Sequence, residues 1–297
     1  MNHRNLLLLL KCLAILGNKT SIKRIKLKSP LRYPGGKTRA VKHILPHFPN
    51  NIKELCSPFV GGGSIELALA TEGIRVYAYD IFDPLVCFWA HLIEDPEKLA
   101  NTAASYRPLD KETFKTLQED LRNMPNGDNN YAAIFYALNR SSFSGATIAG
   151  GYSKEAAEKR FTESSIQRIR DFKAENFSVE KADFKDSIPK HPDAFLYLDP
   201  PYLLGKDKET LYGDRGSTHK GFDHMGLANI LRGRDNWILS YNNCPEILKL
   251  YENYDILYPD WKYGMSSDKN SKEVLIINKG IEWQRNIVQM KSYNQRF

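Results

Sequence analysis

Short apolar runs alternate with longer segments of helical periodicity along most of this 297-residue chain. Seven of the apolar runs have the length of strands and are bounded by turn residues. Strands separated by helices predict an α/β fold, in which a doubly wound, mostly parallel sheet forms the core. The predicted strands are 52–57, 74–79, 176–182, 194–198, 237–241, 255–258 and 273–278.

The stretch between the second and third predicted strands is too long for a simple connection. It has no strand alternation, and helical patterns cover 83–92, 96–106, 110–124 and 130–138. The following residues, 139–152, are rich in Ser and Gly and predict a ribbon or a surface loop. We therefore expect a main domain at 25–86 and 175–280, an inserted helical module at 87–174, an N-terminal extension at 1–24 and a tail at 281–297.

The tetrapeptide Asp199-Pro200-Pro201-Tyr202 ends the fourth predicted strand and puts two acceptors and an aromatic ring into one turn. Two consecutive prolines donate no backbone hydrogen bonds and keep the preceding residue extended, so the Asp199 carboxylate and the Pro200 carbonyl project from the strand end. Such acceptors can hold the N–H bonds of an exocyclic amino group, while the Tyr202 ring offers a stacking face for a base. The pattern favours methylation of an amino group, and an ordinary strand exit is the alternative.

A glycine-rich turn, 57–64 (SPFVGGGS), follows the first predicted strand, where a doubly wound sheet binds its ligand. Gly61 and Gly63 allow close approach of a cofactor, but Glu66 stands where a dinucleotide fingerprint has its third glycine, which weakens the case for NAD. Asp80 ends the second predicted strand, where a carboxylate can accept hydrogen bonds from two ribose hydroxyls. Together these features indicate a nucleoside pocket.

A third motif, Leu-Arg-Tyr-Pro-Gly-Gly-Lys, lies upstream at 31–37. In this order, the three motifs and Asp80 resemble the Dam-type, D12 class of DNA adenine-N6 methyltransferases. The resemblance covers roughly residues 27–279, including 137–145, which is similar to the family's DNA-recognition segment, and 272–275, similar to its last catalytic strand. It implies the fold of S-adenosylmethionine-dependent methyltransferases, with the main domain as the catalytic domain and the inserted module as the target-recognition domain.

The resemblance also implies roles for individual residues. Asp199 and the Pro200 carbonyl hold the amino group of an adenine flipped out of double-stranded DNA, and the Tyr202 ring stacks on the base without a role for its hydroxyl. The expected DNA contacts are Arg32, Asn139 and Arg140. The expected contacts to S-adenosylmethionine are Tyr33, Lys37, Phe59, Gly61, Gly63, Asp80 and Asp183.

The distribution of charge along the chain affects which parts of it are expected to bind DNA. A hydrophobic content of 42% with 26% charged residues is ordinary for a globular protein, and the net charge of +7 suits a polyanionic partner. However, residues 1–53 contain 12 Lys or Arg and no Asp or Glu, whereas the rest of the chain has 30 basic and 35 acidic residues. DNA binding by the body must therefore depend on local clusters, with Arg32, Lys37, Arg39 and Arg140 as candidates.

The remaining composition predicts a cytoplasmic protein without a metal centre. Four cysteines and seven histidines show no spacing typical of a metal site or of a disulfide framework. The apolar stretch 6–16 is broken by Lys11 and is too short to span a membrane, so 1–24 is predicted to be an extra helix or an extension. Glycine-containing turn pairs in 203–221 predict a long loop or lid after the Asp199 turn.

Other enzymes solve the same chemical problem and remain alternatives. An RNA-base or protein-glutamine N-methyltransferase acts on similar planar nitrogens, and cytosine-N4 methyltransferases more usually have Ser in place of Asp199. A non-catalytic DNA-binding protein with this fold is a further alternative, which the intact Asp199 disfavours. The 31–37 motif and the inserted module favour DNA, for which a cognate restriction endonuclease is a candidate functional partner.

Overall fold

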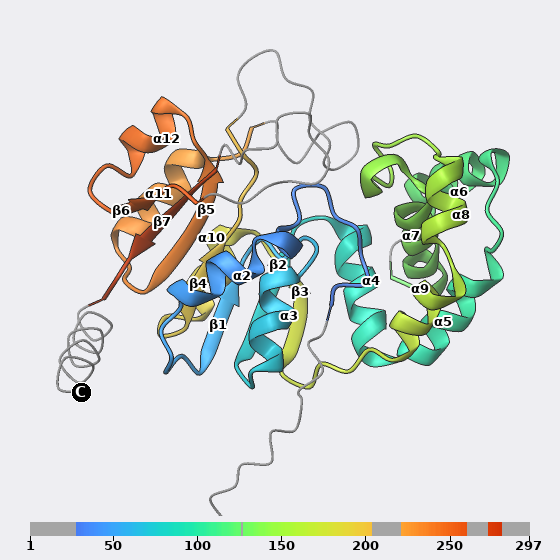
Figure 1. Ribbon diagram of the computed structural model, residues 1–297, viewed down its shortest axis with the longest axis horizontal. Coiled ribbons are helices and arrows are strands. Elements are labelled where there is room, and N and C mark those ends of the chain that lie inside the picture. Colours follow the sequence, from blue (N-terminus) through green and yellow to red (C-terminus); the bar gives the residue numbers. More distant parts are fainter. Residues whose placement is uncertain (1–27, 126, 204–220, 260–272, 281–297) are drawn as a thin grey trace, which may run out of the picture.

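A seven-stranded sheet forms the centre of the protein (Figure 1). The computed structural model describes residues 28–125, 127–203, 221–259 and 273–280. The strands are β1 (Glu54–Ser57), β2 (Arg75–Asp80), β3 (Phe177–Lys181), β4 (Phe195–Leu198), β5 (Trp237–Asn242), β6 (Asp255–Leu257) and β7 (Glu273–Asn278). Their order is β3-β2-β1-β4-β5-β7-β6. Neighbours from β3 to β5 pair in parallel, whereas β7 is antiparallel to β5 and to β6.

All seven predicted strands are present, with ends that differ by no more than two residues, and the α/β class with a mostly parallel sheet is confirmed. Every residue of β4 is buried, because both faces of the sheet are covered. Phe195 and Tyr197 pack into one hydrophobic core, and Leu196 and Leu198 into another. This alternation explains why the strand is a continuous apolar run in the sequence.

Helices cover the two faces of the sheet. On one face lie α2 (Val41–Ile44) and α3 (Ser64–Thr71), together with the short 3₁₀ helices η1 (Lys37–Arg39) and η2 (Leu45–His47). On the other face lie α10 (Phe184–Lys190), α11 (His224–Arg232) and α12 (Pro245–Leu250). Figure 1 shows α2 near β1, α3 over β2 and β3, and α11 and α12 close to β5.

The insertion between β2 and β3 is helical, as predicted. The predicted helices appear as α4 (Asp83–Glu94), α5 (Pro96–Ser105), α6 (Lys111–Asn123) and α7 (Asn129–Ser141). Asp95, Asp110 and Asp128 cap α5, α6 and α7 by accepting backbone N–H hydrogen bonds. Two further helices, α8 (Lys154–Arg160) and α9 (Glu163–Arg170), were not predicted. In α8 only Ala156 is buried, so the sequence has no apolar stripe to reveal it.

The helices α5 to α9 gather on one side of the sheet, beyond the β3 edge (Figure 1). Helix α4 runs across the predicted boundary at residue 87 and packs against both β3 and α7. It therefore joins the sheet to the inserted module, while the function of that module in target recognition stays a prediction.

Some sequence predictions lie outside the described residues. These are the extension 1–24, the tail 281–297 and all of the predicted lid except its first and last residues. In the part of the chain that the structure describes, no helix is long and apolar enough to cross a membrane.

Candidate active site

The carboxyl ends of β1, β2 and β4 meet at one edge of the sheet, where the order of the strands reverses between β1 and β4. The glycine-rich turn follows β1, Asp80 ends β2, and Asp199 follows β4. One pocket at this edge brings together ten of the predicted site residues, namely Tyr33, Lys37, Phe59, Gly61, Gly63, Asp80, Asp183, Asp199, Pro200 and Tyr202. Asn139, Arg140 and Arg32 are not among its lining residues.

The glycine-rich turn depends on missing side chains. Gly61 and Gly63 have φ angles of 45° and 65°, in the left-handed region that favours glycine. A Cβ on Gly61 would lie 3.0 Å from Cε1 of Tyr33, whose ring packs on the turn. The Trp89 indole of α4 donates a hydrogen bond to the Gly61 carbonyl at 3.1 Å. The turn is thus held from two sides, by Tyr33 of the 31–37 segment and by Trp89 of α4.

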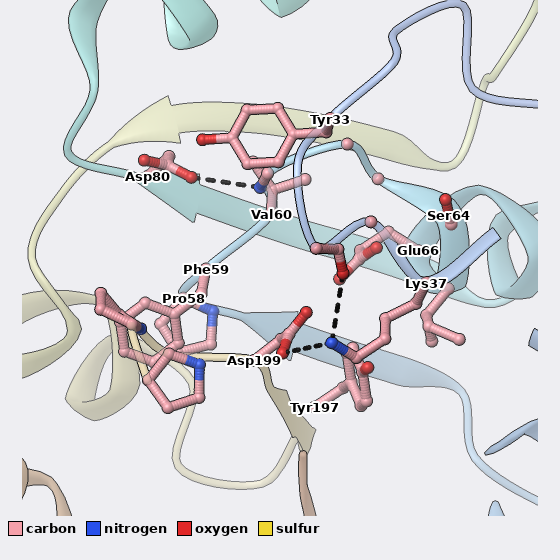
Figure 2. Close-up of a pocket in the computed structure, with 18 of the residues that line it drawn as sticks. Tyr33, Lys37, Pro58, Phe59, Val60, Ser64, Glu66, Asp80, Tyr197 and Asp199 are labelled. Carbon is pink, nitrogen blue, oxygen red and sulfur yellow. Dashed lines mark hydrogen bonds and ion pairs between the residues drawn. The ribbon is translucent and has the colours of Figure 1, made fainter. Parts of the chain in front are cut away.

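Asp80 fixes the same turn from β2. Its Oδ2 accepts a hydrogen bond from the Gly61 N–H and its Oδ1 from the Phe82 N–H, both at 3.1 Å (Figure 2). Burial raises the pKa of Asp80 to about 6, and the two backbone hydrogen bonds oppose that rise. Each carboxylate oxygen keeps capacity for another donor.

An apolar wall extends from Asp80. Phe59 contacts Phe184 and Phe222 with ring centroids 5.9 and 5.7 Å apart. Ile81, also in the pocket, is 47% exposed. Asp183 lines this end and caps α10 by accepting a hydrogen bond from the Lys185 N–H. Such a wall can hold an aromatic base.

Asp199 and Lys37 form a buried ion pair at the other end of the pocket. The Lys37 side chain is 4% exposed, and its ammonium lies 2.8 Å from Asp199 Oδ1 (Figure 2). The same ammonium lies 3.4 Å from Glu273 Oε1. Burial raises the pKa of Asp199 to about 6 and Glu273 adds to the rise, while Lys37 opposes it. The second oxygen of Asp199 points toward the middle of the pocket (Figure 2).

The Tyr202 hydroxyl belongs to this ion-pair cluster, which the sequence analysis did not expect. It accepts a hydrogen bond from Lys37 Nζ at 2.8 Å, contacts Glu273 Oε1, and lies 3.3 Å from Asp199 Oδ1. The Tyr202 ring stacks against Tyr241 with centroids 5.9 Å apart. The sequence analysis assigned this hydroxyl no role, whereas in the structure it contacts three charged groups; stacking of the ring on a base stays a prediction.

Three polar residues of this region were missed as site residues by the sequence analysis. Glu66, on α3, and Tyr197, on β4, line the pocket, and Glu273, on β7, is 7% exposed beside Lys37. Glu66 entered the sequence analysis only as the residue in place of a third glycine. A lone charge inside the apolar run 65–70 is the signal that could have identified it.

Asn139 lies in α7 and holds the 31–37 segment. Its side chain accepts a hydrogen bond from the Arg32 N–H at 3.0 Å and donates to the carbonyls of Arg32 and Gly145 at 2.9 and 3.1 Å. A Cβ on Gly145 would lie 1.9 Å from the Arg32 carbonyl oxygen, so this contact requires glycine. Asn139 is 1% exposed, which gives it a positioning role in place of the predicted direct contact with DNA.

Arg140 also differs from its predicted place in the Ser/Gly-rich loop. It lies in the last turn of α7, and its guanidinium donates to the Arg160 carbonyl at 2.9 and 2.8 Å. Burial lowers the pKa of Arg140. The loop itself begins at the Ser142–Tyr152 bridge, after Arg140. Because its donors point to main-chain carbonyls, the structure does not support the prediction that Arg140 reads a base.

We expect Arg140→Ala to lower the free energy of unfolding by about 2 kcal/mol, because two charge-assisted hydrogen bonds are lost from a mostly buried group. Urea denaturation checks this value. Competition binding with single-base variants of the DNA site should show that all sequences are weakened alike. Unchanged stability with relaxed preference at one base would restore the role in base recognition.

Comparisons with known proteins agree with this geometry. Residues 33–265 match the family described as D12 class N6 adenine-specific DNA methyltransferase. The chain is 23% identical over 285 residues to Type II methyltransferase M1.LlaDCHI of Lactococcus lactis subsp. cremoris, covering 86% of this chain and 97% of that protein. It is 26% identical over 263 residues to Type II methyltransferase M.MjaIII of Methanocaldococcus jannaschii, covering 78% and 90%. Modification methylase StsI of Streptococcus sanguinis is 23% identical over 283 residues, covering 85% of this chain and 43% of that protein.

Proposed function

Because this chain belongs to the D12 class of N6 adenine-specific DNA methyltransferases, we propose that the pocket in Figure 2 is where it methylates DNA adenine, with S-adenosylmethionine as donor. One observation carries the proposal. A single pocket has a carboxylate suited to ribose, Asp80, at one end and a carboxylate suited to an amino group, Asp199, at the other. A nucleoside donor and a base can therefore meet between them.

The pocket residues fit S-adenosylmethionine. The turn at 61–63 lines the pocket and has no side chains of its own, so a cofactor can approach its backbone. Asp80 can accept the ribose hydroxyls, and the wall of Phe59, Ile81 and Phe184 can hold the adenine ring. When bound, S-adenosylmethionine supplies an electrophilic methyl group on a positively charged sulfur.

Asp199 and Pro200 are proposed to hold the target amino group. Asp199 Oδ1 is anchored by Lys37, so the second oxygen keeps a fixed direction toward the pocket and can accept one amino N–H. The Pro200 carbonyl can accept the other. The nitrogen becomes acidic only as its bond to carbon forms, so the Asp199 carboxylate stabilises developing charge and is placed to accept the released proton.

The DNA side of the site is proposed from exposure and charge. A buried cofactor pocket requires the adenine to leave the duplex, and we propose that it stacks on the Tyr202 ring, which lines the pocket. Phe143, in the loop after α7, is 72% exposed, as expected of an apolar group that meets a partner. Burial lowers the pKa of Arg32, and the nearby charges of Arg160 and Arg140 lower it further; a cluster of like charges attracts phosphate. We propose that the inserted module contacts double-stranded DNA through this region.

Sequencing of modified bases tests the function directly. The full chain is expressed in cells that lack adenine methylation, and genomic DNA is compared with DNA from cells that express the Asp199→Asn variant. N6-methyladenine at one recurring sequence is the expected result. N4-methylcytosine, or methyl groups only in RNA or protein, would contradict it. We also propose a cognate restriction endonuclease as a functional partner, because two relatives bear the name Type II methyltransferase. A nuclease that cleaves the unmethylated recognition sequence and spares the sequence methylated by this chain would be that partner.

We expect Asp80→Asn to weaken binding of S-adenosylhomocysteine by about 2 to 4 kcal/mol, because the charged acceptor for ribose is lost. The amide oxygen of asparagine can still accept the Gly61 N–H, but its NH₂ group then faces the Phe82 N–H, so the melting temperature of the variant is a required control. Titration calorimetry measures the cofactor affinity, and DNA affinity serves as the control, since it should change little. An unchanged dissociation constant for the cofactor would remove Asp80 from the ribose site.

A further inference from the structure

Glu66 is a buried carboxyl group with no part in the reaction proposed above. It lies in the first turn of α3 and is 2% exposed. Its Oε1 accepts a hydrogen bond from the Ser57 hydroxyl at 2.7 Å. Within the described ranges of the chain, no lysine, arginine or histidine forms an ion pair with it. A buried carboxylate without a countercharge is unfavourable, and burial accordingly raises the pKa of Glu66 to about 7.

A second polar group beside the pocket also lacks a partner. The Tyr197 hydroxyl is buried, lines the pocket and forms no hydrogen bond within the described residues. The Lys37 ammonium forms its ion pairs with Asp199 and Glu273 rather than with Glu66. This end of the pocket therefore has unused hydrogen-bonding capacity and uncompensated negative charge, which a cationic ligand would satisfy.

We infer that Glu66 binds the cationic groups at the aliphatic end of the methyl donor, which carries an ammonium, a sulfonium and a carboxylate and therefore a net positive charge. The inference rests on the proposed function, since it takes S-adenosylmethionine as the ligand. Figure 2 shows Glu66 at the end of the pocket that holds Lys37 and Asp199, away from Asp80. A nucleoside held at Asp80 directs its aliphatic end toward Glu66.

Binding of such a cation is coupled to the proton of Glu66. The charged group that acts on Glu66 is Asp199, which follows β4, and Tyr197 of β4 is influenced by both carboxylates. Lys37 from η1 and Glu273 from β7 also act on Tyr197. Glu66 must be ionised to attract a cation, so the ligand releases a proton wherever Glu66 is partly protonated. Affinity for the cationic donor should therefore decrease as the pH falls through about 7.

Titration calorimetry on the full chain tests this coupling. The number of protons released on binding is obtained by measuring the binding enthalpy at about pH 6.5 in two buffers with different ionisation enthalpies. We expect Glu66→Gln to bind S-adenosylmethionine about 10- to 100-fold more weakly and to release fewer protons than the wild type. Methylthioadenosine has neither cationic group, so its affinity should change less than about twofold. Glu94→Gln, at an exposed position at the end of α4, is the matched control.

The outcomes separate the inference from the proposed function. If neither nucleoside binds the wild type, the proposed function fails. If S-adenosylmethionine binds Glu66→Gln with unchanged affinity and proton release, only the inference is overturned. S-adenosylhomocysteine, which keeps the ammonium and the carboxylate but has no sulfonium, assigns the contact to ammonium if its affinity also falls and to sulfonium if it does not. Should Glu66→Gln not fold, the pH dependence of the two wild-type affinities is compared, and equal dependence overturns the inference.

Discussion

Asp199→Asn is expected to lower the rate of methyl transfer by at least about 1,000-fold while cofactor and DNA affinities change only a few-fold. Asparagine has nearly the same shape, but its side chain is neutral and half of it is a hydrogen-bond donor. It can neither stabilise positive charge on the target nitrogen nor accept the released proton. Since this charge develops mainly in the transition state, the loss should appear in the chemical step and not in binding.

Single-turnover methylation of a duplex with 2-aminopurine at the target position separates these steps, because its fluorescence reports flipping independently of chemistry. The variant leaves Lys37 with one carboxylate fewer, so its melting temperature and its affinity for S-adenosylhomocysteine are required controls. A folded variant that binds both ligands yet methylates within about tenfold of the wild-type rate would rule out the electrostatic role.

The strands and the pocket edge could be predicted from the sequence because each depends on local pattern. Buried parallel strands are apolar runs, and the carboxyl ends of neighbouring strands lie side by side in any doubly wound sheet. The glycine-rich turn, Asp80 and Asp199 each stand directly after such a run. Their meeting in one pocket therefore follows from the strand order alone.

The ion-pair cluster could not be predicted, because its members come from distant parts of the chain. Lys37 and Glu273 are separated by 236 positions, and only the return of β7 between β5 and β6 brings them together. Side-chain direction is equally invisible in the sequence. Arg140 looked like a base-reading residue by its neighbours, yet the end of α7 directs its guanidinium to main-chain carbonyls.

The buried carboxyls of the pocket lower the stability of the unliganded protein at neutral pH. Burial raises the pKa of Asp80 and Asp199 to about 6 and that of Glu66 to about 7. Folding raises the pKa of such a carboxyl. The group therefore stabilises the fold fully at a pH below its pKa in the unfolded chain, and this stabilisation is lost as the pH rises through its pKa in the folded protein. Ligands that supply hydrogen-bond donors and positive charge offset this loss. The site therefore favours ligand binding and lowers the stability of the unliganded protein.

Lys37→Met is expected to move the acidic limb of the pH profile of kcat/KM upward by about one unit or more. In the wild type, Asp199 must be ionised to accept the amino group, so activity should fall as the pH drops through about 6. Removing the ammonium 2.8 Å from Asp199 Oδ1 raises the pKa of Asp199 further, since burial and Glu273 are then opposed only by the hydrogen bond from the Tyr202 hydroxyl. Activity at neutral pH should decrease strongly and recover in part as the pH is raised.

This measurement distinguishes the two roles that sequence and structure give to Lys37. The sequence resemblance placed it at the cofactor, whereas the structure places its ammonium on Asp199, Glu273 and the Tyr202 hydroxyl. A role in cofactor binding alone predicts a higher KM for S-adenosylmethionine with an unmoved acidic limb. A role in tuning Asp199 predicts the shifted limb even at saturating cofactor, and Lys37→Arg, which keeps the charge, should leave the limb near its wild-type position.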